Sequence, residues 1–145
     1  MDQSVLKEAA AKLNIIQNGR FATLLFIIGS FLILIEYNES EKSVFETMFN
    51  TTGKDQASDS DAKAAELAEI ASLMFLIAVL IYTINAINTA EIELNDLNPD
   101  SNTESLLSNI TTIKGSNIIA FFDLIKIIGF AGAALGFHIN ATAVK

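Results

Sequence analysis

Three long apolar stretches, separated by polar and acidic segments, are the feature that most limits how this chain folds. They lie within residues 15–37, 64–88 and 117–138, and each is close to the ~20 residues that cross a bilayer as a helix. Of the 145 residues, 51% are hydrophobic and 18% are charged, whereas a soluble domain carries about 25% charged residues. We therefore predict an all-α integral membrane protein with three transmembrane helices, in which residues 1–145 form a single membrane domain.

The segment before the first span has a helical pattern of its own. Within residues 1–18, apolar side chains such as Val5, Leu6 and Leu13 recur at helical spacing, with charged residues between them. This pattern predicts a short N-terminal amphipathic helix. Such a helix either lies on the membrane surface or on a partner, or simply leads into the first span.

Two polar segments separate the three spans. Residues 38–61 are expected to form a polar acidic loop, and residues 89–116 a polar acidic connection. Gly53 and Pro99 are the strongest turn signals in these two segments. Arg20 is the cation nearest to a span, and it favours an N-terminus inside a plasma (inner) membrane.

The composition excludes several classes of function. There is no cysteine, so disulfides, thiolate metal sites and thiol catalysis are excluded. The net charge is −8, which argues against a nucleic-acid partner, because nucleic acids bind positive surfaces. No nucleophile elbow, phosphate loop or zinc-protease motif occurs, so we expect neither an enzyme nor a bound cofactor or metal.

Asp123 and Lys126 are charged residues inside the last apolar stretch. A charge near the middle of a membrane costs at least about 2.5–3.5 kcal/mol, so it usually faces protein or water and has a partner. At a spacing of i,i+3 the two residues can pair along one helix. Three interpretations stay open: an ion or proton relay or pore lining, a structural salt bridge within or between subunits, or a shifted span in which both residues snorkel to the interface.

Small residues follow the charged pair along the same span. Gly132 and Gly136 form a G-x-x-x-G pair, and small side chains let two helix backbones approach closely in a bilayer. At 100° per residue, a single stripe holds Lys126, Gly129, Ala133, Gly136 and Asn140. We predict helix–helix contact through Gly129, Gly132, Ala133 and Gly136, with Asn140 as a further polar intramembrane residue. Because three helices offer little surface to bury this stripe, we also predict a homo-oligomer.

Three further ionisable residues lie near the ends of the spans. Glu66 and Glu69 are a carboxylate pair at i,i+3 that could bind a cation or share a proton. The simpler interpretation is that they complement the dipole at the start of a helix. His138 is the one histidine and is interpreted as an interfacial polar residue or, less simply, a switch.

These patterns predict a small oligomeric membrane protein that conducts ions, protons or small solutes. Asp123, Lys126 and Asn140 would lie along the path. The alternative is a non-conducting scaffold or regulatory subunit of a membrane complex, in which the small-residue stripe docks on another membrane protein. In both cases the lipid bilayer is a partner.

Overall fold

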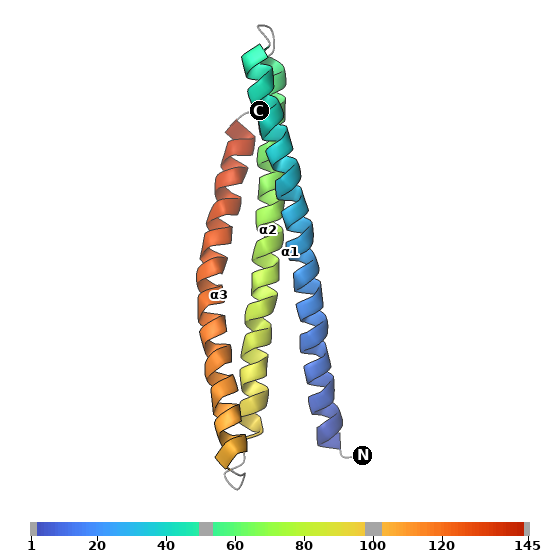
Figure 1. Cartoon of the computed structure of the whole chain (residues 1–145), viewed down its shortest axis with the longest axis vertical. Helices are drawn as coiled ribbons and strands as arrows, with labels where there is room; N and C mark the ends of the chain where they lie inside the picture. The colour runs from blue at the N-terminus through green and yellow to red at the C-terminus, as the bar shows by residue number, and fades with distance from the viewer. Residues whose placement is uncertain (1–2, 50–53, 98–102, 144–145) are drawn as a thin grey trace. The chain divides into compact units, whose positions relative to one another are not determined.

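The computed structural model consists of three long α-helices, and it describes residues 3–49, 54–97 and 103–143. The helices are α1 (Gln3–Phe49), α2 (Lys54–Asn95) and α3 (Thr103–Ala143), as Figure 1 shows. All three are long and apolar enough to cross a membrane. The predicted all-α fold with three such helices is therefore confirmed.

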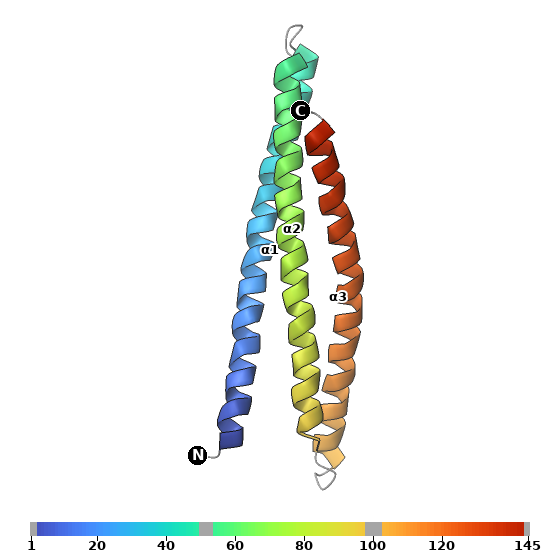
Figure 2. The ribbon, with the colours of Figure 1, turned by 180° about the vertical axis from the view of Figure 1, so that it is seen from behind.

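The predicted short N-terminal amphipathic helix is not shown as a separate element. Residues 3–18 are the first part of α1, which continues without interruption to Phe49 in both views (Figure 1, Figure 2). Gly19 does not break the helix, and none of the described glycines has a positive φ. A helix that satisfies its own backbone hydrogen bonds is the form that lipid requires, so a glycine at the start of a span remains helical.

The helices extend through most of residues 38–61 and 89–116, where the sequence predicts a polar acidic loop and a polar acidic connection. Residues 38–49 and 54–61 belong to α1 and α2, and residues 89–95 and 103–116 belong to α2 and α3. These segments hold many residues that tolerate helix well, and polarity by itself does not end a helix. The turn signals at Gly53 and Pro99 lie outside the described residues.

The chain divides into two compact units, and each unit takes part of every helix. Unit 1 comprises Met1–Thr23 and Ala78–Ile127, and unit 2 comprises Leu24–Ile77 and Ile128–Lys145. The expected single membrane domain stays a prediction.

Small side chains fill the interior, and large apolar side chains face outward. The buried apolar residues are almost all alanines, with Val79 as the largest side chain that is fully buried. In contrast, Ile128 is 75% exposed, Phe31 62% and Phe121 61%. Small residues let helices pack closely in a membrane, and lipid tails accept the outer apolar surface that water would not. This distribution fits a membrane location.

Three half-buried phenylalanines and one glycine pack together in unit 2. The ring centroids of Phe26 and Phe75 are 5.2 Å apart, and those of Phe75 and Phe130 are 5.4 Å apart. Phe75 also lies directly against Gly29 of α1. A side chain at position 29 would occupy the space of the Phe75 ring, so glycine is what permits this close approach of α1 and α2.

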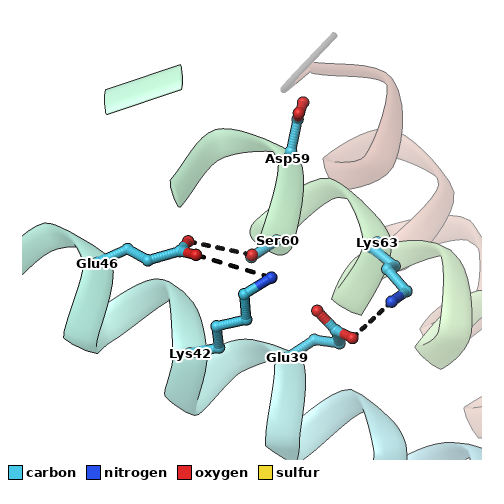
Figure 3. A pocket seen from close by; sticks show the side chains of 6 residues that line it. All are labelled: Glu39, Lys42, Glu46, Asp59, Ser60 and Lys63. Atoms are coloured by element: carbon cyan, nitrogen blue, oxygen red, sulfur yellow. Dashed lines mark hydrogen bonds and ion pairs between the residues drawn. The ribbon is translucent and has the colours of Figure 1, made fainter. Parts of the chain in front are cut away.

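A group of polar residues in unit 2 lies between α1 and α2. It includes Glu39, Lys42, Glu46, Ser60 and Lys63. Lys63 Nζ lies 2.5 Å from Glu39 Oε1, and Ser60 Oγ donates to Glu46 Oε2 at 3.2 Å (Figure 3). Lys42 Nζ is 3.7 Å from the other oxygen of Glu46. These contacts help to explain why residues 38–49 and 54–61 are helical and do not form a loop. Their polar side chains form ion pairs and hydrogen bonds within α1 and between α1 and α2.

Candidate functional site

The charged pair of the last span is formed as predicted along one helix. Lys126 Nζ donates to Asp123 Oδ1 at 2.7 Å. The two partners differ sharply in exposure, because the Asp123 side chain is 6% exposed and the Lys126 side chain 58%. The carboxylate therefore faces the interior of unit 1, and the ammonium group lies at its surface.

Asp123 and Lys126 line a groove between α2 and α3 within unit 1, with polar side chains on both walls and a mostly apolar accessible lining. The groove has a volume of about 460 Å³. On α3 the groove is lined by residues that recur at helical spacing on one face: Ser116, Ile119, Asp123 and Lys126. Its α2 wall consists of Tyr82, Asn85, Ala86 and Thr89.

Asn85 is the most unusual polar residue of the groove, because half of its amide has no partner. The residue is 7% exposed, and its Nδ2 donates to the backbone carbonyl of Ile15 in α1 at 3.0 Å. Across the described residues, no hydrogen-bond donor reaches the buried Oδ1. A buried acceptor of this kind normally has a protein or water partner, so this oxygen marks a place for a donor.

A tyrosine connects the groove to α1. The hydroxyls of Tyr82 and Thr23 are 2.7 Å apart. Thr23 Oγ1 also donates to the carbonyl of Gly19 at 2.9 Å, so its single hydrogen is used and Tyr82 is the donor of the shared bond. Together with the bond from Asn85, this contact holds the first part of α1 against α2 in unit 1.

A second groove, of about 250 Å³, also lies within unit 1. It runs between α1 and α2, and Ile15, whose carbonyl accepts from Asn85, is one of its lining residues. Its polar lining residues are Asn14, Asn88, Glu91 and Asn95.

The glycines of the small-residue face of α3, which consists of Gly129, Gly132, Ala133 and Gly136, have open space beside them. Gly129, Gly132 and Gly136 are exposed, and Ala133 is half-buried. In the part of the chain that the structure describes, nothing lies within 4 Å of a Cβ built on any of these glycines. The face is therefore free to contact lipid or another molecule, and its predicted role in helix–helix contact stays a prediction.

The remaining predicted residues lie in unit 2. Asn140 is exposed and lines a groove with Glu36, Ser40 and Asp61, among others. Glu69 Oε1 lies 3.1 Å from His138 Nδ1, a pairing that the sequence did not indicate, while Glu66 is exposed. In the described ranges, no cluster of three or more histidine or acidic side chains is placed to hold a metal ion.

Comparisons with known proteins do not assign the chain to a family. No protein-family model, curated protein or solved structure matches the chain. The chain is an all-helical protein with three helices long and apolar enough to span a membrane.

Proposed function

We propose that several copies of this chain associate in a membrane and form a path for protons, ions or small solutes beside Asp123 and Lys126. The observation that carries the proposal is the exposed ammonium group of Lys126 within an apolar span. If the Lys126 side chain faced lipid, placing its charge in the membrane would cost at least about 2.5–3.5 kcal/mol of free energy. We therefore expect protein or water to contact it. Assembly with further copies supplies that contact.

The small-residue face supports association of copies. Its three glycines are exposed, and nothing in the described residues lies within 4 Å of a Cβ built on them. Since lipid exerts no hydrophobic force between helices, close backbone contact through glycine is what drives their association.

The contact can be tested with a matched pair of substitutions in α3. Gly136→Ile adds bulk to the small-residue face, whereas Ala131→Ile adds it to an exposed position about 140° away on the helix. We expect Gly136→Ile to lower the mass of the detergent-solubilised oligomer and Ala131→Ile to leave it unchanged. Equal masses for wild type and both variants would refute the contact.

Conduction needs a separate measurement. Wild-type protein in liposomes should conduct, and Lys126→Leu should change the flux or its charge selectivity while the oligomer persists, because charges along a path set which ions enter. If the wild type passes neither protons nor ions, the scaffold or regulatory-subunit alternative holds instead. A plasma (inner) membrane location and an inside N-terminus are parts of the proposal.

A further inference from the structure

We infer that the groove lined by Asn85 and Asp123 holds water in the membrane, and that it admits small water-soluble molecules to Asp123 from one side only. That side is the one on which α2 ends and α3 begins. The inference deepens the proposed function and rests on it for the use of the route. Its test does not depend on conduction.

The unpartnered oxygen of Asn85 is the first reason. Asn85 Oδ1 is buried in a residue only 7% exposed, and the described chain offers it no donor. Lipid tails carry no donor, so lipid in the groove would leave this oxygen unsatisfied. Water that reaches Asn85 through a small local movement supplies the donor that this buried oxygen lacks.

The lining and size of the groove are the second reason. Most of the accessible lining is apolar, but Tyr82, Thr89, Ser116 and the charged pair place polar groups on both walls. A buried water needs two to four such partners. The volume of about 460 Å³ holds several waters, since one water takes up about 30 Å³ in the liquid.

The lining of the groove gives the route its direction. From Asp123 the lining continues to Ser116, which lies toward the start of α3, and to Thr89, which lies toward the end of α2. Polar groups therefore extend from Asp123 toward the side on which α2 ends and α3 begins.

The charged pair decides which occupant fits. Lys126 Nζ is 2.7 Å from the carboxylate and repels a metal cation that approaches Asp123. Water suits both members of the pair, because it can donate to the carboxylate and accept from the ammonium group. The groove is thus a hydration site rather than a metal site.

Two neighbouring isoleucines of α3 provide a matched test. Ile118 and Ile119 are 58% and 55% exposed and differ by one residue in depth, but only Ile119 lines the groove. The chain has no cysteine, so Ile118→Cys and Ile119→Cys each carry a single thiol. The probe is a charged, membrane-impermeant methanethiosulfonate applied to one side of the full-length protein in liposomes.

Reaction requires the thiolate, which forms in water and not in lipid. We therefore expect Ile119→Cys to be labelled at least about tenfold faster than Ile118→Cys, and only from the side on which α2 ends. Adding Asn85→Leu to Ile119→Cys should slow its labelling, because the acceptor that holds water is gone. Should that double variant fail to fold, Thr89→Cys against Ile87→Cys repeats the comparison on α2.

Equal labelling of Ile118→Cys and Ile119→Cys, or equal labelling from both sides, would overturn the inference. The outcome is also separable from that of the proposed function. Labelling in the groove without any flux would keep the water route and refute conduction, whereas flux without labelling would do the reverse.

Discussion

Gly29 offers a direct measurement of how closely α1 and α2 approach in unit 2. A Cβ added there would lie 2.7 Å from Cε1 of Phe75 and 3.1 Å from Cδ1 and Cζ of the same ring. The ring cannot move aside freely, because its centroid lies 5.2 Å from that of Phe26 and 5.4 Å from that of Phe130. Gly29→Ala must therefore displace a helix or rearrange the aromatic group.

The expected size of the effect follows from two opposing terms. Extra atoms in a packed interior cost about 1–3 kcal/mol. Replacing a helical glycine by alanine stabilises the helix by up to about 1 kcal/mol, because alanine has the higher helix propensity. Gly115→Ala isolates the second term, since across the described chain nothing lies within 4 Å of a Cβ at that position. The two variants should differ by about 1–3 kcal/mol, with Gly29→Ala the less stable.

The assay is thermal unfolding of both variants in detergent, followed by loss of helical circular dichroism. Phe75→Leu provides the internal check, because removing the ring should make Gly29→Ala tolerable. The penalty should then shrink in the double variant, as expected for two residues in contact. Equal stability of Gly29→Ala and Gly115→Ala would show that α1 and α2 do not approach as described.

Two further predictions concern unit 1, and both are measured by unfolding in detergent. Lys126→Leu should cost about 1.5–3 kcal/mol because it removes a hydrogen bond to the charged Asp123 carboxylate, and Asp123→Leu should cost less because an exposed lysine can reach water; additive effects in the double variant would argue against the pair. Tyr82→Phe should cost about 0.5–1.5 kcal/mol through loss of the bond to Thr23, whereas Tyr37→Phe, at an exposed tyrosine, should cost nothing measurable. Equal losses in the two tyrosine variants would contradict this assignment.

The apolar stretches sufficed to predict the number and type of helices, but not where the helices end. Length and composition predict a helix of spanning size. They do not show that residues 38–49 continue α1, because some of the partners of these polar residues lie on α2. Glu39, for example, pairs with Lys63, which is 24 residues away in sequence. Helix ends that depend on contacts between helices cannot be read from one segment at a time.

Only part of the candidate site was predictable, because the site depends on contacts between two helices. Asp123 and Lys126 are three residues apart on one helix, so spacing alone predicts their contact. The groove around them needs α2, and its polar residues recur at helical spacing as Tyr82, Asn85 and Thr89. That spacing was a usable signal for a polar face on α2, but it does not reveal that this face meets the face of Asp123.

The polar groups within the spans find many of their partners on their own helix, and this bears on how the protein enters a membrane. Hydroxyls donate to the carbonyl four residues earlier at Thr23, Ser30 and Thr83. The charged pair of α3 likewise closes within a single turn. In a membrane these groups would need no second helix to offset their cost in lipid, because their partners lie on the same helix. Fewer hydrogen bonds form only when the helices pack together. They are chiefly those of Tyr82 and Asn85.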